Sequence, residues 1–96
     1  MTAETSGTAQ LWHRIDQFVG TEIEDSFVIL DVERAAYFSF NPSAKDIWNL
    51  LEEPISVDRI AEHLTARYDV SRDVCTQSIE RMLSRFSDKG LVHPVG

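Results

Sequence analysis

The first half of the chain alternates between short apolar runs and polar clusters, a pattern typical of antiparallel strands joined by turns. The apolar runs cover residues 17–23, 27–32 and 36–40. The second and third runs are rich in β-branched and aromatic residues, which favour strands. Because strand side chains alternate between faces, Phe38 and Phe40 are expected on one face, and Tyr37 and Ser39 on the other. The pattern predicts a three-stranded antiparallel meander.

After this meander the apolar positions change to the spacing of three and four residues that amphipathic helices show. Asn41 and Pro42 favour a helix start, because Asn can accept from free backbone amides and Pro suits the first helical position. Pro54 cannot continue a helix, so the first helix is expected over about residues 42–53. Its apolar positions are Ile47, Leu50 and Leu51.

Two further helices are predicted, each preceded by a serine that can cap it. Ser56 precedes the second helix and Ser71 precedes the third. Their apolar stripes consist of Val57, Ile60, Ala61, Leu64 and Tyr68 in the second helix, and of Cys75, Ile79, Met82, Leu83 and Phe86 in the third. Gly90 is expected to end the third helix in a left-handed conformation, before a short extended end.

This order of elements predicts an α+β fold, in which the helices lie on one side of a small antiparallel sheet. Three compact helices joined by tight turns resemble a winged-helix core. A chain of 96 residues suits a single domain, because chains of this size form one core. Residues 1–10 lack apolar periodicity and are expected to form a flexible tail, which leaves residues 11–96 as one winged-helix-like domain.

The composition is that of an ordinary globular protein, with 43% hydrophobic and 26% charged residues. No stretch approaches the roughly 18 apolar residues of a membrane span, and the first ten residues resemble no signal peptide. The single cysteine, Cys75, cannot form an internal disulfide, which suits a reducing compartment. We therefore expect a cytoplasmic protein that has no membrane partner.

The net charge argues against nucleic acid as a partner. Nine Lys and Arg residues stand against sixteen Asp and Glu, so the net charge of −7 repels phosphate backbones. Winged-helix proteins often read DNA with their third helix, but residues 71–90 carry four cationic and three anionic side chains, a sum of only +1. DNA-binding helices normally carry a basic stripe. A winged-helix transcription regulator is therefore the alternative function rather than the favoured one.

No group of residues in the sequence suggests catalysis, a metal or a cofactor. His13, His63 and His93 are 50 and 30 residues apart, and none has another ligand at metal-binding spacing. Cys75 falls on a core stripe, where packing is a commoner role than nucleophilic attack. The GxGxxG, Walker and GxSxG motifs are absent. The sequence therefore predicts a binding protein rather than an enzyme, with no metal and no cofactor.

The last strand of the meander is the candidate binding site, because its outer edge is expected to be unpaired and could accept a strand from a peptide. A flank of the third helix, offset from its core stripe, would lie beside that edge, and the two together could line a groove. Tyr37, Val74 and Met82 would supply apolar contacts, and Arg81 or Arg85 would select acidic residues. The candidate peptide-binding residues are Ala36, Tyr37, Phe38, Ser39, Phe40, Val74, Ser78, Arg81, Met82 and Arg85.

Two other interpretations of this edge stay open. The edge could be twisted away or covered by the N-terminal tail, in which case the arginines would form only a solvated face. The edge could instead pair with a second copy of the chain, so that the protein acts as an adaptor that dimerises. A monomer or a weak dimer is the expected oligomeric state.

Several short motifs between residues 30 and 92 together resemble one protein family, and the similarity covers roughly residues 18–93. They are LDVER at 30–34, YFS at 37–39, NPSA at 41–44, IW at 47–48, LL at 50–51, YDV at 68–70 and GLV at 90–92. These motifs are similar to those of the PqqD-like family, whose members are recognition elements in pathways that modify ribosomally made peptides. Ala35 and Ala36 depart from the family pattern, in which many members carry a glycine in this turn, so the hairpin can use a different turn type.

The resemblance implies a small winged-helix-like domain without catalytic activity of its own. Such proteins capture the leader segment of a precursor peptide as an added strand beside the third strand and against the third helix, and present it to a modifying enzyme. The implied partners are the precursor peptide and an enzyme such as a leader peptidase in lasso-peptide pathways, or a radical S-adenosylmethionine (SAM) enzyme in pyrroloquinoline quinone (PQQ) synthesis. The sequence of residues 30–48 looks more similar to the lasso-peptide branch than to the PQQ branch.

Overall fold

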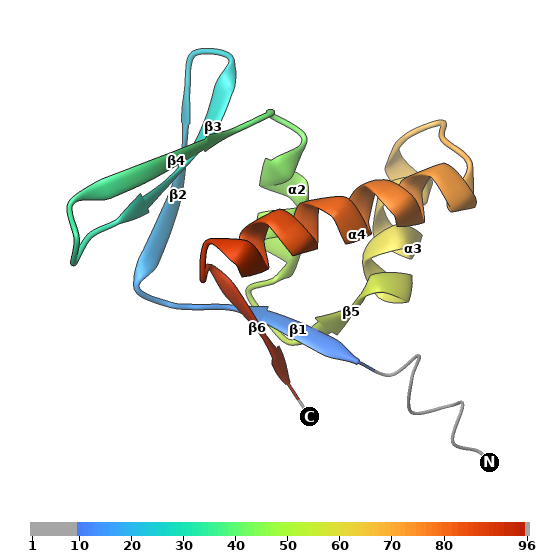
Figure 1. Cartoon of the computed structure of the whole chain (residues 1–96). Coiled ribbons are helices and arrows are strands. Elements are labelled where there is room, and N and C mark those ends of the chain that lie inside the picture. Colours follow the sequence, from blue (N-terminus) through green and yellow to red (C-terminus); the bar gives the residue numbers. More distant parts are fainter. Residues whose placement is uncertain (1–9, 96) are drawn as a thin grey trace.

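A computed structural model describes residues 10–95 as two small antiparallel sheets and three helices (Figure 1). The strands are β1 (Leu11–Arg14), β2 (Phe18–Ile23), β3 (Ser26–Asp31), β4 (Ala36–Phe40), β5 (Ile55–Ser56) and β6 (Val92–Val95). The helices are α2 (Ala44–Leu50), α3 (Val57–Arg67) and α4 (Arg72–Asp88). The predicted α+β class is confirmed, and winged-helix is a loose description of this arrangement.

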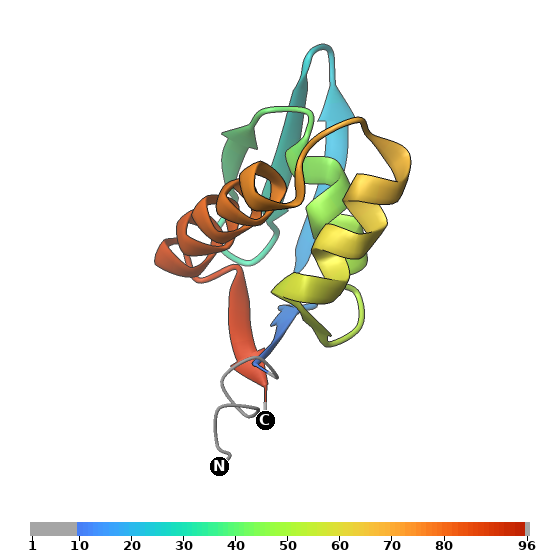
Figure 2. The ribbon, with the colours of Figure 1, turned by 90° about the vertical axis from the view of Figure 1, so that its right-hand side faces the viewer.

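The predicted meander is confirmed as a sheet in the order β2-β3-β4. All neighbouring strands are antiparallel, and Leu30 of β3 lies opposite Tyr37 of β4. The three helices lie on one side of this sheet (Figure 2). Since β3 occupies the middle, β4 forms one edge of the meander.

A second sheet, in the order β5-β1-β6, was not predicted as a sheet. Its strands are two to four residues long and come from three distant parts of the sequence, so none of them carries a clear alternating pattern. Only the extended end near Val92 was anticipated, and Val92 lies opposite Arg14 of β1. The predicted tail lies outside the described residues except for Gln10, whose side-chain amide donates to the Val95 carbonyl at 3.3 Å.

The first helix is shorter than the predicted range of 42–53. Pro42 and Ser43 belong to a turn in which the Ala44 N–H donates to the Asn41 carbonyl at 2.9 Å, and α2 then ends at Leu50. The Ser43 side chain makes no capping hydrogen bond. The start was misplaced because proline suits a turn before a helix as well as the first helical position.

The two longer helices begin at the predicted serine caps. The Ser56 hydroxyl accepts from the Arg59 N–H, and the Ser71 hydroxyl accepts from the Val74 N–H, both at 3.2 Å. Gly90 follows α4 with a φ of +73°, as predicted for a left-handed end. These local signals placed α3 and α4 because each cap involves residues only three positions apart.

The core lies between the inner face of the meander and the helices. Phe86 of α4 packs edge-on against Phe40 of β4 and Trp48 of α2, at centroid distances of 5.0 and 5.6 Å. Ile29, in the central strand, is fully buried. These contacts fix α4 against the β4 side of the sheet.

No helix within residues 10–95 is both long enough and apolar enough to cross a lipid bilayer.

Candidate functional site

The outer edge of β4 has no strand partner within the described chain, because β4 pairs only with β3. In an antiparallel strand, alternate residues direct their N–H and C=O groups away from the neighbouring strand. The five residues of β4 therefore present a short row of backbone donors and acceptors. This geometry suits the addition of one more strand.

The two faces of β4 are chemically different. Phe40 contacts Phe86 of α4, so Phe38 and Phe40 lie on the helix side of the sheet. Tyr37 and Ser39 lie on the outer side, and Tyr37 is 70% exposed. The strand thus separates the predicted site residues into two groups, and Tyr37 does not share a surface with the residues of α4.

Most of the predicted helix residues share one flank of α4 and lie at its surface. Val74 is 55% exposed, and Ser78, Arg81 and Arg85 are also exposed. Met82 was assigned to this surface, and that assignment is wrong because only 8% of the residue is exposed. Met82 belongs to the core stripe. Because successive residues of a helix are rotated by about 100°, Met82 and its neighbour Arg81 point in different directions.

Two cations of α4 lie over aromatic rings of β4. The Arg85 guanidinium carbon is 5.2 Å from the centroid of Phe40, and Lys89 Nζ is 5.4 Å from the centroid of Phe38. Lys89 was not predicted as a site residue, although its spacing of four residues from Arg85 could have indicated it. We call the free edge of β4 together with Val74, Ser78, Arg81, Arg85 and Lys89 the edge site.

The cations of the edge site have no acidic partner among residues 10–95. The ion pairs in this part of the chain involve Arg34, Lys45, Arg59, Arg67 and Arg72, and they leave out the three cations of the edge site. The edge site therefore combines backbone pairing groups with a row of available positive charges at intervals of four residues along α4.

The outer face of the meander is unusually apolar. Val19, Ile23, Leu30 and Tyr37 are all exposed there, around a shallow hollow of about 520 Å³ that Leu30 and Tyr37 help to line. The sequence signal for this face was the run of consecutive apolar residues in β3. Because strand side chains alternate between the two faces, such a run places apolar side chains on the outer face as well as on the inner one. A strand added to β4 would extend this face.

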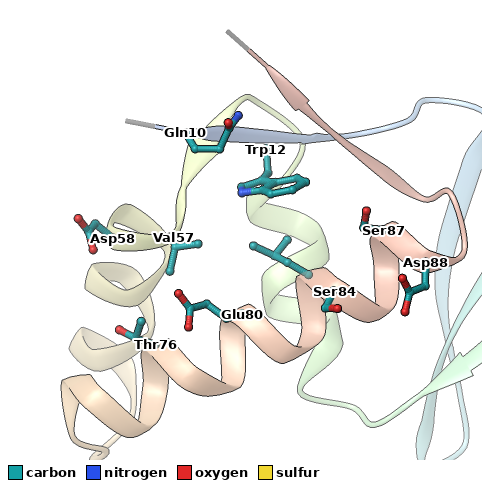
Figure 3. A pocket seen from close by; sticks show the side chains of 10 residues that line it. Gln10, Trp12, Val57, Asp58, Thr76, Glu80, Ser84, Ser87 and Asp88 are labelled. Carbon is teal, nitrogen blue, oxygen red and sulfur yellow. The ribbon is translucent and has the colours of Figure 1, made fainter. Parts of the chain in front are cut away.

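A larger hollow, of about 660 Å³, lies on the other flank of α4, away from the edge site (Figure 3). It is bordered by β1 and the start of α3 as well as by α4. Trp12 and Glu80 are among its lining residues, and neither was singled out from the sequence.

The described residues contain no group of three or more His, Cys, Asp or Glu side chains that could hold a metal ion. Cys75 is buried in the core stripe of α4. The pKa of Tyr68 is raised from its usual value of 10.0, mainly because its hydroxyl donates to Asp46 Oδ2 at 2.5 Å. This contact joins the end of α3 to α2 and lies outside the edge site.

Comparison with solved structures finds two similar chains. "TbiB1 in Complex with the TbiA(beta) Leader Peptide" has a TM-score of 0.70 and 27% sequence identity, over 84% of this chain and 94% of that chain. "Lasso peptide synthetase B1 complexed with the leader peptide" has a TM-score of 0.68 and 21% identity, over 86% of this chain and 98% of that chain, a likeness that concerns the fold alone.

Comparison with curated proteins gives no match. A family model does match, and it covers residues 26–92, which is well over half of the chain. Its description is "Coenzyme PQQ synthesis protein D (PqqD)". The matched segment contains β4, α4 and the elements between them, so it includes the whole edge site. The chain belongs to the PqqD family.

Proposed function

We propose that this protein is a peptide recognition element that binds the leader segment of a ribosomally made precursor by adding it as a strand to β4. The observation that carries the proposal is the unpaired edge of β4 beside a cationic flank of α4, in a chain of the PqqD family. Support comes from the similar chain TbiB1, which was solved in complex with a leader peptide. Residues 11–96 act as the binding domain.

Backbone hydrogen bonds to β4 hold the leader in register. About five leader residues can pair with the strand, since β4 itself has five residues. Alternate leader side chains then point to the α4 side, where Arg85 and Lys89, which lie over Phe40 and Phe38, favour carboxylates. Arg81 and Val74 continue this flank of α4 and would meet leader residues beyond the paired segment. The remaining side chains join the outer apolar face beside Tyr37. A peptide held in this way should bind with a dissociation constant of about 10 nM to 10 μM.

The protein carries out no reaction itself and presents the bound leader to a modifying enzyme. A lasso-type pathway with a leader peptidase is the favoured setting, because both similar chains were solved with a leader peptide and one of them is a lasso peptide synthetase B1. A radical SAM enzyme of PQQ synthesis is the second candidate, because the family description names that coenzyme. The cytoplasmic location stays a prediction from the sequence.

The alternative function, a DNA-binding transcription regulator, receives no support from the family or from the similar structures. The net charge of −7 also opposes it. The adaptor hypothesis, in which two β4 edges pair, stays open to measurement.

Amide hydrogen exchange of the whole chain tests the proposal. In the free protein, the outward amides of β4 should exchange much faster than those of β3. Adding the leader of the precursor encoded beside this protein's gene should slow them at least tenfold, while α3 stays unchanged. The TbiA(beta) leader serves as a second probe peptide. Amides of β4 that are already fully protected, and that neither peptide affects, would contradict the proposal.

A further inference from the structure

The hollow on the far flank of α4 is lined by both apolar and acidic side chains (Figure 3). Its apolar lining residues are Trp12, Val57 and Leu83, and its charged ones are Asp58, Glu80 and Asp88. No lining residue is a lysine, an arginine or a histidine. We call this hollow the acidic groove.

The two flanks of α4 carry opposite charges. The flank at the edge site has Arg81, Arg85 and Lys89, whereas the flank at the acidic groove has Glu80, and Asp88 lies between the two flanks near the end of the helix. The ion pairs among the described residues include neither of these carboxylates. One helix thus separates a surface that attracts anions from a surface that attracts cations.

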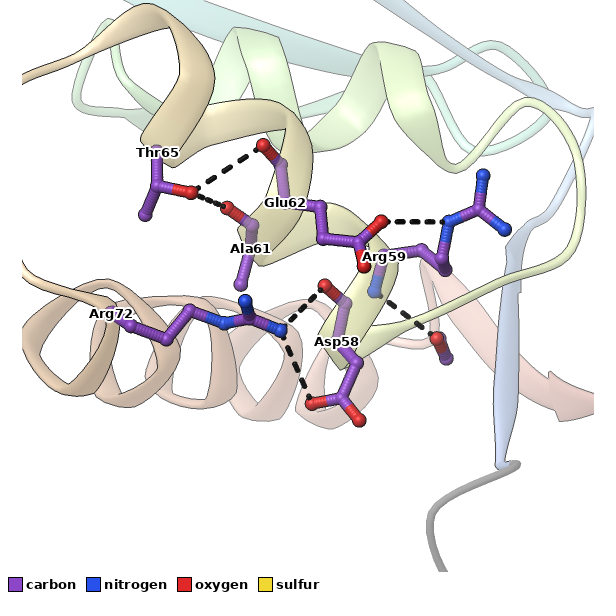
Figure 4. Close-up of polar contacts among 7 residues, drawn as sticks. Asp58, Arg59, Ala61, Glu62, Thr65 and Arg72 are labelled. Atoms are coloured by element: carbon purple, nitrogen blue, oxygen red, sulfur yellow. Dashed lines mark hydrogen bonds and ion pairs between the residues drawn. The ribbon is translucent and has the colours of Figure 1, made fainter.

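The third carboxylate of the groove is partly neutralised. Arg72 donates to the Asp58 backbone carbonyl at 3.2 Å, and its guanidinium lies 3.8 Å from Asp58 Oδ1 (Figure 4). The backbone carbonyl and the carboxylate of Asp58 therefore both contact Arg72, and these contacts hold α3 against the start of α4. Glu80 and Asp88 are left as the main attraction for a cation in the groove.

The apolar lining residues of the groove favour a cation that also has an apolar body. The Trp12 indole is half-buried in the groove lining, and an indole ring attracts a cation placed over its face. Arginine and lysine side chains combine an aliphatic stem with a charged end, so they can lie on Trp12 and Leu83 while they reach a carboxylate. A carboxylate or a phosphate would be repelled from the groove, because all of its charged lining residues are acidic.

We propose that the acidic groove binds a segment of the modifying enzyme that carries at least two arginine or lysine side chains. This inference rests on the proposed function, which requires such an enzyme. From Thr76 to Asp88 the groove follows α4 for about 18 Å, enough for about five extended residues. A second copy of this chain is a poor occupant, since its net charge of −7 would repel the groove. Leader and enzyme would occupy opposite flanks of α4, so both could be bound together.

A direct test uses the acetylated and amidated pentapeptide Gly-Arg-Gly-Arg-Gly as the probe, and a second peptide with glutamine in place of arginine as its control. Titration of the whole protein is followed by NMR. The arginine peptide should shift the Trp12 indole signal and the amides of Glu80 and Ser84, with millimolar affinity that falls as salt rises. Shifts of equal size with the glutamine peptide, or shifts confined to β4, would overturn the proposal.

Paired substitutions separate local charge from overall charge. The variant Glu80→Lys with Asp88→Lys should lose at least tenfold in affinity for the arginine peptide. The matched variant Glu53→Lys with Asp69→Lys has the same change in net charge but alters two exposed residues outside the groove lining, so it should lose less than threefold. Similar losses in both variants would show that only the overall charge matters, which contradicts a site. Circular dichroism checks that both variants are folded.

Leader binding and enzyme turnover distinguish this inference from the proposed function. The groove variant should bind the leader at least as tightly as the unchanged protein, and saturating leader should not displace the arginine peptide. In a reconstituted reaction with the enzyme encoded beside the precursor, the groove variant should require at least tenfold more of that enzyme for half-maximal rate. An unchanged requirement would overturn the groove proposal and leave leader binding intact. A protein that fails to bind its leader, with an intact groove, would instead contradict the proposed function.

Discussion

Gly20 and Ala35 show how close packing and backbone conformation limit the side chain at single positions of the meander. A Cβ atom at Gly20 would lie 2.4 Å from Phe27 Cζ and 2.9 Å from Trp48 Cδ1. Ala35, in the turn before β4, has a φ of +54°, in the left-handed region that glycine adopts without strain. A glycine in this turn would therefore fit the conformation that this alanine takes.

Replacing Gly20 with alanine should destabilise the protein by about 2–3 kcal/mol, because Phe27 and Trp48 would have to move within a packed core. The measurement is the free energy of unfolding in urea. Gly90→Ala is the matched control: nothing lies within 4 Å of its added Cβ, and only the positive φ opposes it, at a cost of about 1 kcal/mol. A larger loss at Gly90 than at Gly20 would contradict this account.

Replacing Ala35 with glycine should stabilise the protein by about 0.5–1 kcal/mol. Relief of the left-handed strain, of about 1–2 kcal/mol, exceeds the free-energy cost of the extra conformational entropy that glycine gives the unfolded chain. The neighbouring Ala36→Gly change lies in β4 without a positive φ, so it should instead cost about 0.5–1 kcal/mol. Thermal unfolding of the two variants should therefore shift in opposite directions; shifts in the same direction would rule out the strain argument.

At the scale of elements, β4 and α4 contribute different parts of the edge site. The strand offers its backbone along one free edge, and the helix offers three cations and Val74 along one flank. Packing of Phe40 against Phe86 holds the two elements side by side. Strand pairing should therefore set the register of the leader, and α4 should select its side chains.

Substitution of Ser39 by proline should weaken leader binding at least tenfold, because proline removes a backbone donor and distorts the edge strand. Isothermal titration with the leader measures the change. The matched variant Ser39→Ala keeps the backbone donor and should bind within threefold of the unchanged protein. Circular dichroism and the melting temperature show whether the proline variant is still folded; a folded proline variant with normal affinity would exclude strand addition.

Reversal of charge at Arg85 should weaken binding of an acidic leader about three- to tenfold and reduce the dependence of that binding on salt. The Arg85→Glu variant loses a cation over Phe40 and places a carboxylate beside the leader. Arg59→Glu makes the same charge change on α3, where Arg59 pairs with Glu62 and lies outside the edge site. Equal effects of the two variants would indicate that overall charge, and not the flank of α4, governs binding.

At the scale of the whole molecule, charge and shape point to peptides rather than nucleic acid. The net charge of −7 is unevenly placed, because residues 1–34 carry seven acidic and two basic side chains. The cations of α4 lie opposite an acidic flank on the same helix. Such a molecule has no continuous basic face, within the described chain, with which to follow a phosphate backbone.

Duplex DNA should therefore fail to shift in a gel at low ionic strength, at protein concentrations that saturate the leader peptide. The expected result follows from long-range repulsion between the acidic protein and the phosphates, which is greatest when salt is low. A mixed-sequence duplex of about 30 base pairs is sufficient, because the non-specific part of binding does not depend on sequence. A salt-sensitive complex would restore the transcription-regulator alternative.

Local signals in the sequence determined much of the fold. The meander, the two serine caps and Gly90 were predictable because each depends on residues that are close together in the chain. The net charge argued against nucleic acid, and the expected free strand edge and the family motifs indicated a peptide-binding protein. The second sheet was missed because β1 meets β5 and β6 across more than forty residues of sequence, and strands of two to four residues leave no local pattern.

The tertiary structure alone decided how the candidate residues are divided among surfaces. It assigned Met82 to the core, Tyr37 to the outer face of the sheet and Lys89 to the row of cations. It also brought Trp12 of β1 to the groove that Glu80 lines on α4. Periodicity in a sequence states which residues share a face of one element, but the packing of elements against each other decides what each face meets.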